Sequence, residues 1–208
     1  TPAAKPEAQP NEPWLTVDHS KLEALQKNFT SAKDLTDTCL SCHNKTLEQF
    51  QHSIHWTWRA PNSTKDRIVG KGGDSINNFC VSTNYMHDHE CLDCHIGWDR
   101  KTEAINCMNC HGDLTFNYEE AVEDIEAFLE EGDEESLEMA HDVQQDLKNA
   151  AQRIQLPTRK HCGSCHFYGG GWEGVKHGDL DKSLETPTKE LDVHMGIDGQ
   201  NFQCTRCH

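Results

Sequence analysis

The sequence predicts a mainly α-helical fold with long irregular segments, in which something other than a large apolar core organises the chain. Only 35% of the 208 residues are hydrophobic and the mean hydropathy is −0.80, both low for a globular domain. Apolar residues recur at helical spacing between residues 119 and 156, whereas no segment has the pattern of a multi-stranded sheet. Because a protein-only core would be thin, we expect bound groups to supply much of the buried surface.

One recurring pattern accounts for nearly all the cysteines. Ten of the 11 fall into five copies of Cys-x-x-Cys-His, where the composition predicts roughly 0.04 copies by chance. The copies are Cys39-Cys42-His43, Cys91-Cys94-His95, Cys107-Cys110-His111, Cys162-Cys165-His166 and Cys204-Cys207-His208. Two thiols at this spacing add to the two vinyl groups of one haem, and the adjacent His becomes the proximal iron ligand. The pattern predicts five covalently bound haem c groups, each with one iron.

Three other uses of cysteine pairs explain the sequence less well. Zinc sites combine such pairs two at a time, as Cys91/Cys94 with Cys107/Cys110 would allow, but zinc gives no reason for a His after every pair. A disulfide framework has no fixed five-residue pattern. A thioredoxin-like pair occurs once, near a βαβ pattern that is absent here. Only haem attachment explains all five copies.

The charge restricts the partners. The formal net charge is −16 before any haem propionate is counted, and this field opposes binding to nucleic acid. It suits a redox partner with a cationic surface, or a protein that resists association. A small anionic substrate would need a local positive patch. Lys65, Arg67 and Lys71 form such a cluster in the long loop that the Gly, Pro, Asn and Ser residues of 60–79 predict.

The domain organisation and location follow from the same features. Residues 1–17 are predicted to be an extended arm like that left after removal of a signal, and 18–208 a single five-haem domain. No stretch approaches the roughly 18 apolar residues that span a bilayer, and no secretion signal is visible. Because haem attachment to this motif takes place outside the cytoplasm in bacteria, we expect an exported protein, periplasmic or extracellular.

Helical patterns precede the first motif and separate the third from the fourth. Leu22, Leu25 and Phe29 predict a short helix within 18–29. Further on, one helix is predicted to stop near Gly132 and a second before Pro157. Their apolar stripes are Val122, Ile125, Phe128 and Leu129, and then Leu137, Ala140, Val143, Leu147, Ala150, Ala151 and Ile154. These make a helical hairpin over 119–156 with a solvated acidic outer face.

Each iron needs a sixth ligand or an open position. Nine histidines lie outside the motifs: His19, His52, His55, His87, His89, His141, His161, His177 and His194. So many candidates favour mainly bis-His coordination, which implies low potentials and electron transfer. Met86 and Met195 are weaker alternatives. The eleventh cysteine, Cys80, is either an unpaired buried thiol, a partner in an intermolecular disulfide, or a thiol near a reactive haem.

A further pattern runs through segments from about residue 18 to the end of the chain. The most specific is the Gly-rich stretch after the fourth motif, Phe167-Tyr168-Gly169-Gly170-Gly171. The others are 162–166, 174–180, 191–195, 55–58, 77–80 and 18–21. Together they resemble the octahaem tetrathionate reductase family of c-type cytochromes, specifically its N-terminal five-haem part. That family carries eight haems, so we expect a shortened relative, a partial product, or a subunit whose neighbour covers the haem at His208.

The resemblance implies roles for particular residues. In that family one haem has a distal lysine with a cysteine close by, and it is reported to act on tetrathionate, nitrite or hydroxylamine. Lys176 would be that ligand, Cys80 that cysteine and the haem on Cys91/Cys94 the special one; otherwise Lys176 is a solvent-exposed side chain. The resemblance also implies that the distal ligands of the other four irons are His19, His55, His177 and His194.

These observations predict a pentahaem c-type cytochrome that carries electrons along closely packed haems, in respiratory or extracellular electron transfer. Its partners would be redox proteins or neighbouring copies of itself, as in a larger haem assembly. The alternative is an enzyme, a reductase of a small inorganic substrate (tetrathionate, nitrite or hydroxylamine) at the lysine-ligated haem. A purely structural or metal-storage role gives no reason for five covalent haems.

Overall fold

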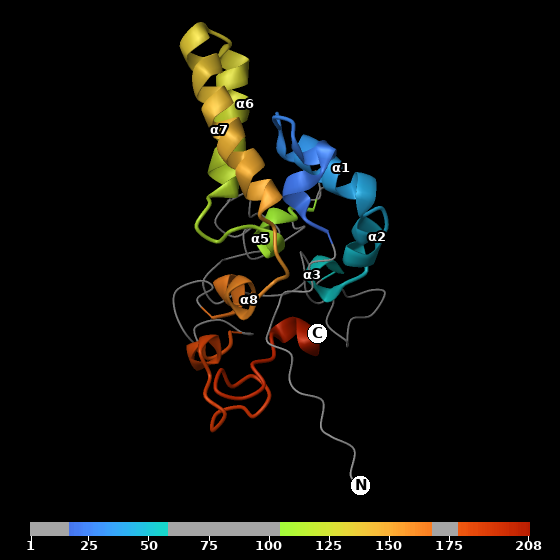
Figure 1. The fold of residues 1–208 in the computed structure, drawn as a ribbon, viewed down its shortest axis with the longest axis vertical. Helices are drawn as coiled ribbons and strands as arrows, with labels where there is room; N and C mark the ends of the chain where they lie inside the picture. The colour runs from blue at the N-terminus through green and yellow to red at the C-terminus, as the bar shows by residue number, and fades with distance from the viewer. Residues whose placement is uncertain (1–16, 58–104, 168–178) are drawn as a thin grey trace, which may run out of the picture.

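The computed structural model describes residues 17–57, 105–167 and 179–208 (Figure 1). The regular elements in these ranges are all helical, which confirms the predicted mainly α and irregular fold. They are η1 His19–Lys21, η2 Glu23–Leu25, α1 Ala32–Cys42, α2 Thr46–Gln51, α3 Ile54–Thr57, α5 Met108–His111, α6 Tyr118–Glu131, α7 Glu134–Gln152, α8 Arg159–His166, η4 Lys182–Glu185 and η5 Cys204–Arg206, where η denotes a 3₁₀ helix. None of these helices is long and apolar enough to cross a bilayer.

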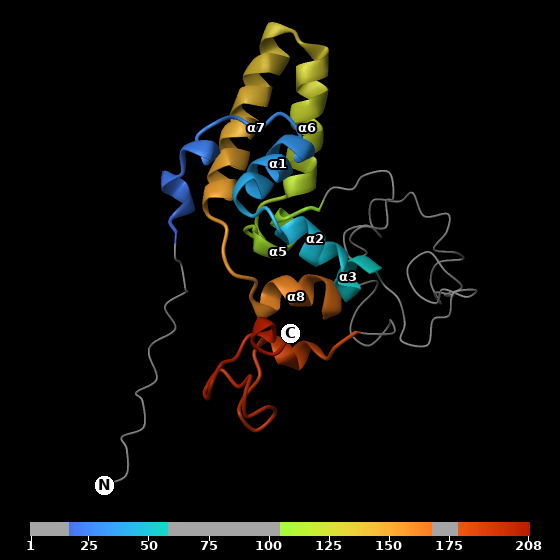
Figure 2. The same ribbon diagram turned by 90° about the vertical axis from the view of Figure 1, so that its right-hand side faces the viewer.

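The predicted helical hairpin is present as α6 and α7. The side chain of Asn117 accepts a hydrogen bond from the Glu120 amide at the start of α6, and that of Asp133 accepts one from the Ser136 amide at the start of α7. Gly132 ends α6 in the left-handed conformation, with φ of 71°, which glycine adopts at little cost. The hairpin forms one end of the long axis in both views (Figures 1 and 2).

The apolar stripe of the hairpin is buried except near the turn. Ile125, Ala140 and Leu147 are at most 1% exposed, whereas Leu129 and Leu137 near the turn are 37% and 46% exposed. The acidic side chains of the outer face need no partner because water solvates them. The predicted stripe is therefore buried along most of the hairpin and exposed beside the turn.

The core is the set of residues between the hairpin base and the elements beside it. It comprises Leu25, Phe29, Leu35, Met108, Tyr118, Val122, Ile125, Leu147, Ala150 and Ala151, with Cys39 among the partly buried residues packed against it. We call this set the apolar cluster. It joins η2, α1 and α5 to the hairpin, so it brings the first and third motifs to the same place.

The helix predicted within 18–29 is replaced by two 3₁₀ turns. Leu22 lies between them with an extended backbone, φ −78° and ψ 127°. Short 3₁₀ turns are common as connectors, and here the chain still delivers Leu25 and Phe29 to the apolar cluster, where they are 5% and 0% exposed. The apolar spacing correctly predicted that Leu25 and Phe29 are buried. The prediction of one continuous helix was wrong.

The opposite end of the molecule is irregular. Below α8, residues 179–208 form loops that are closed by local backbone hydrogen bonds, such as Ile197 N to Pro187 O at 2.8 Å. Figure 2 shows α5 between the hairpin and α8, and the C-terminal loops beyond α8. The order along the long axis is thus hairpin, α5, α8 and C-terminal loops.

Replacing Leu147 tests the position of the core. Leu147 is 0% exposed in the apolar cluster, so Leu147→Ala should lower the free energy of unfolding by about 2–5 kcal/mol. Leu137→Ala on the same helix is the matched control, because its side chain is 46% exposed. Thermal unfolding followed by circular dichroism measures both. Equal losses in the two variants would contradict the assigned core.

Candidate functional site

The first motif lies at the end of α1. Ser31 caps this helix by accepting a hydrogen bond from the Asp34 amide at 3.1 Å. Cys39 lies one turn after buried Leu35 and packs against the apolar cluster, whereas Cys42 is exposed. The helix ends at Cys42, and the His43 amide donates to the Cys39 carbonyl. The thiols and the histidine therefore share one helix end.

The third motif is held by the chain that follows the hairpin. His111 Nδ1 donates a hydrogen bond to the Gln155 carbonyl at 2.9 Å, and the Gln155 amide donates back to the His111 carbonyl at 2.9 Å. A donor at Nδ1 fixes the tautomer and leaves Nε2 with a lone pair, as an iron ligand requires. The hydrogen bond to Gln155 therefore holds the His111 ring in the tautomer that coordinates a metal through Nε2.

The fourth motif occupies α8, whose first turn is closed by a capping box. The Thr158 amide donates to His161 Nδ1 at 3.0 Å, and His161 Nε2 donates to the Gly112 carbonyl at 2.9 Å. Both nitrogens of His161 are thus used, and its ring is 5% exposed. His161 therefore joins α8 to the segment after α5 and has no nitrogen left for iron.

The fifth motif ends the described C-terminal segment on η5. The backbone amide of Arg159 donates to the Gln203 side chain at 2.9 Å, which ties the start of α8 to the residue before Cys204. The His208 amide donates to the Cys204 carbonyl at 3.1 Å. The fourth and fifth motifs are therefore neighbours.

Thiols from different motifs lie within interaction distance. The Cys39 thiol hydrogen bonds to Cys107, which lowers the pKa of Cys107 to about 7 and raises the pKa of Cys39 above its usual range. Burial raises the pKa of Cys162 to about 11, with further contributions from Cys204 and Cys110. None of the eight described motif cysteines is in a disulfide. The four described motifs thus follow one another in space in the order first, third, fourth and fifth.

Hydrogen bonds between the segments support the same order. The Thr36 hydroxyl in α1 donates to the Ile105 carbonyl, just before the third motif, at 3.1 Å and in a buried position. The contact from His161 to Gly112 joins the third motif to the fourth. The contact from Arg159 to Gln203 joins the fourth to the fifth. The arrangement therefore has a fixed register between each adjacent pair.

His19 faces the first-motif histidine. The ring centroids of His19 and His43 lie 6.3 Å apart with an interplanar angle of 14°. The Asp18 side chain accepts from the Ser20 amide and hydroxyl and so fixes the turn that carries His19. These hydrogen bonds, with that to Lys21, lower the pKa of Asp18 to about 2, so the turn keeps its charged cap at neutral pH.

His55 faces the fourth-motif histidine. The ring centroids of His55 and His166 lie 6.2 Å apart with an interplanar angle of 75°. Phe50 and Trp56 pack edge to face at 6.1 Å and so set α3, which carries His55, against α2. Partial burial lowers the pKa of His55, and the charge of His166 adds to this. Both effects favour the neutral imidazole, the form that binds metals.

Each pair has the spacing that one iron between two imidazoles requires. Metal–nitrogen bonds of about 2.0 Å on both sides would separate the ring centroids by about 6 Å. In each pair one ring belongs to a motif and the other does not. Two thiols suited to covalent haem attachment and two imidazoles at the spacing of a shared iron therefore lie together twice within the described residues, which makes each set a candidate haem site.

The remaining predicted residues are not placed in this way. His194 stacks on Phe202 at 6.1 Å, close to the fifth motif, and its side chain is 70% exposed. Its amide donates to Asp192, and no contact with a motif histidine is present in the part of the chain that the structure describes. The second motif (Cys91, Cys94, His95), Cys80, Lys176, His177 and the cluster Lys65, Arg67 and Lys71 lie outside the described residues.

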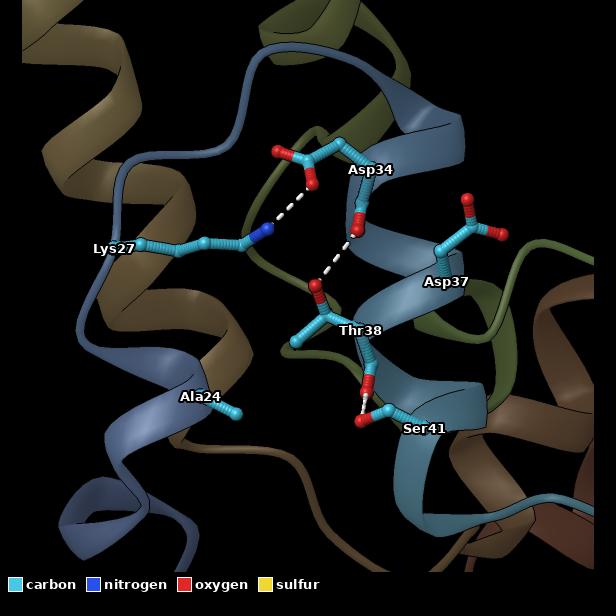
Figure 3. Close-up of a pocket in the computed structure, with 6 residues that line it drawn as sticks. All are labelled: Ala24, Lys27, Asp34, Asp37, Thr38 and Ser41. Atoms are coloured by element: carbon cyan, nitrogen blue, oxygen red, sulfur yellow. Dashed lines mark hydrogen bonds and ion pairs between the residues drawn. The ribbon is translucent and has the colours of Figure 1, made fainter.

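An open groove lies between α1 and the segment that precedes it. It has a volume of about 330 Å³ and is lined by Ala24, Lys27, Asp34, Asp37, Thr38 and Ser41 (Figure 3). An ion pair between Lys27 and Asp34 spans it, and Thr38 bonds to the Asp34 carbonyl. Because its lining has two carboxylates and no thiol or imidazole, it does not suit an anionic haem.

Comparison with known proteins agrees with this class of site. An octahaem cytochrome c from Shewanella oneidensis has a similar structure, with a TM-score of 0.61 and 36% identity. The match covers 92% of this chain and 41% of the octahaem protein, so the chain spans less than half of its length. An uncharacterised protein of Archaeoglobus fulgidus is 24% identical over 95% of this chain and 80% of its own length. No family model matches the chain. The chain is therefore related to the multihaem c-type cytochromes.

A substitution inside the fourth motif tests the local packing. A Cβ built on Gly163 would lie 2.1 Å from Cδ2 of Phe167, whose side chain is 1% exposed. Gly163→Ala should therefore displace this ring and lower the free energy of unfolding by about 1–3 kcal/mol, with a lower haem content by pyridine haemochrome assay. Ser164→Ala, which removes only a hydroxyl bonded to the His161 carbonyl, is the control. An unchanged Gly163→Ala protein would contradict the packing.

Proposed function

We propose that the chain is a pentahaem c-type cytochrome that carries electrons along a row of haems. The observation that carries this proposal is the pairing of His19 with His43 and of His55 with His166. Two imidazoles on one iron leave no position for a substrate, which suits electron transfer. Bound haem c supplies the one-electron chemistry. The chain's own residues fix where each redox centre is attached and how far it lies from the next.

The order of the motifs supports a continuous path. Contacts from Thr36 to Ile105, from His161 to Gly112 and from Arg159 to Gln203 hold the first, third, fourth and fifth motifs in succession. We propose that the haems follow one another in that order. The second motif would attach a fifth haem through Cys91 and Cys94, with His95 as its proximal ligand.

The remaining ligands and the setting belong to the same proposal. His177 and His194 would serve two more irons as distal ligands, and His194 already lies beside the fifth motif. An exported location, periplasmic or extracellular, follows from the haem-attachment chemistry. The charge of −16 suits cationic redox partners, and neighbouring copies of this chain would extend the haem row into a larger assembly.

A second candidate function is reduction of tetrathionate, nitrite or hydroxylamine. It is favoured by the sequence segments around Cys80 and Lys176 and by the 36% identity to an octahaem cytochrome c. Lys176 would be a displaceable ligand at the haem on Cys91 and Cys94. Assays with reduced viologen and each of the three substrates test this function. Absence of turnover on all three would leave electron transfer as the function.

Removing a distal histidine should open one iron. In the reduced protein, His19→Ala and His55→Ala should each bind about one more carbon monoxide per molecule than the unsubstituted protein, because bis-ligated haems resist this ligand. His141→Ala is the matched control, since His141 is exposed on α7 and lies beside Asp142. Spectrophotometric titration measures the uptake. If neither variant binds extra carbon monoxide, the two ring pairs are ordinary packing contacts and not pairs of iron ligands.

The ring planes predict two different EPR signals. Parallel imidazole planes split the iron dπ orbitals of a low-spin ferric haem more than perpendicular planes do. The pair at 14°, His19 and His43, should therefore give a rhombic signal, and the pair at 75°, His55 and His166, a signal with larger g anisotropy. EPR of the oxidised protein, compared with the His19→Ala and His55→Ala variants, assigns them. The reverse assignment would contradict the geometry.

A further inference from the structure

A buried arginine lies between the fourth and fifth motifs. Arg159 is the first residue of α8, three positions before Cys162, and is 4% exposed. Its Nη2 donates to the Met195 carbonyl at 3.0 Å, to the Asn201 side chain at 3.0 Å and to the Phe202 carbonyl at 2.7 Å. One nitrogen therefore binds the whole loop that leads to the fifth motif.

The other two nitrogens of the guanidinium have no partner. Nε and Nη1 are buried and make no hydrogen bond with any residue that the structure describes. Leaving a buried donor unsatisfied is destabilising, and more so when the group is charged; an arginine does not avoid this cost by losing its proton. The contacts with the loop satisfy only Nη2 and therefore do not offset the cost of burying the whole guanidinium.

No described carboxylate supplies the missing partner. Asp192 is near enough for the charge of Arg159 to contribute, as the weakest cause, to the lowered pKa of Asp192. Its Oδ1 is already engaged, however, by the amides of His194 and Met195, each at 2.8 Å. Among the described residues no ion pair joins Arg159 to an Asp or Glu within 4.0 Å. A carboxylate from outside the polypeptide fits this position.

We propose that Arg159 binds a haem propionate. This inference rests on the proposed function, because haem c brings two carboxylates with each attached group. A guanidinium forms its strongest hydrogen bonds with carboxylates, and a buried cation gains most from an anion that shares its low-dielectric surroundings. Arg159 thus joins α8 to the C-terminal loop through Nη2 and neutralises a propionate of the fourth, fifth or another adjacent haem through Nε and Nη1.

The test is a redox titration of three variants of the full holoprotein. In Arg159→Gln the midpoint potential of one haem should fall, because loss of a positive charge stabilises the ferric state. Arg159→Lys retains the positive charge but lacks the guanidinium donors Nε and Nη1, so the midpoint potential of the same haem should fall by less. Lys160→Gln removes an exposed charge from the next residue and should leave every midpoint potential unchanged.

The outcomes separate this inference from the proposed function. If Arg159→Gln and Arg159→Lys keep all their haems and all their potentials, Arg159 only joins α8 to the loop and the propionate proposal is wrong. If Arg159→Gln does not accumulate, the potentials of Arg159→Lys decide in the same way. A titration followed by EPR identifies the haem, since the His55 and His166 signal marks the fourth motif. A protein without covalent haem would instead overturn the proposed function.

Discussion

The apolar cluster beneath the hairpin is the contact on which the arrangement of the motifs depends. It takes Leu35 from the helix of the first motif and Met108 from inside the third, and it packs both against Leu147 of α7. Two cysteine pairs 68 positions apart in the sequence, at Cys39 and Cys107, are thereby brought into contact. Without this cluster nothing in the local sequence would make the first and third motifs neighbours.

Outside the apolar cluster, polar contacts hold the motifs together. The third, fourth and fifth motifs are joined by His161, by the backbone of Gln155 and by Arg159, each of which links segments far apart in the chain. Buried polar groups of this kind fix a register more strictly than apolar packing does, because each donor needs a particular acceptor. This suits a protein in which redox centres have to keep fixed separations, and covalent haem would supply the apolar surface that the sequence lacks.

The sequence predicted what depends on local pattern. The hairpin was predictable from the helical spacing around Ile125 and Leu147 and from the stop at Gly132, and the motif cysteines from the chemistry of attachment. The spatial order of the motifs was not, because contacts such as Thr36 to Ile105 span 69 residues. Arg159 was missed because a charged residue is expected to be exposed. A Thr-x-x-His spacing at Thr158 and His161 is a local signal that could have separated His161 from the candidate ligands.

The number of covalent haems is the most direct test of the central claim. Thioether bonds survive denaturation, so the intact mass of the acid-denatured protein should exceed the 23.6 kDa polypeptide by five haems. Replacing both cysteines of one motif by serine, for example Cys204 and Cys207, should remove one haem from that mass. The bare polypeptide mass, or fewer than five haems on the unsubstituted chain, would contradict a pentahaem cytochrome.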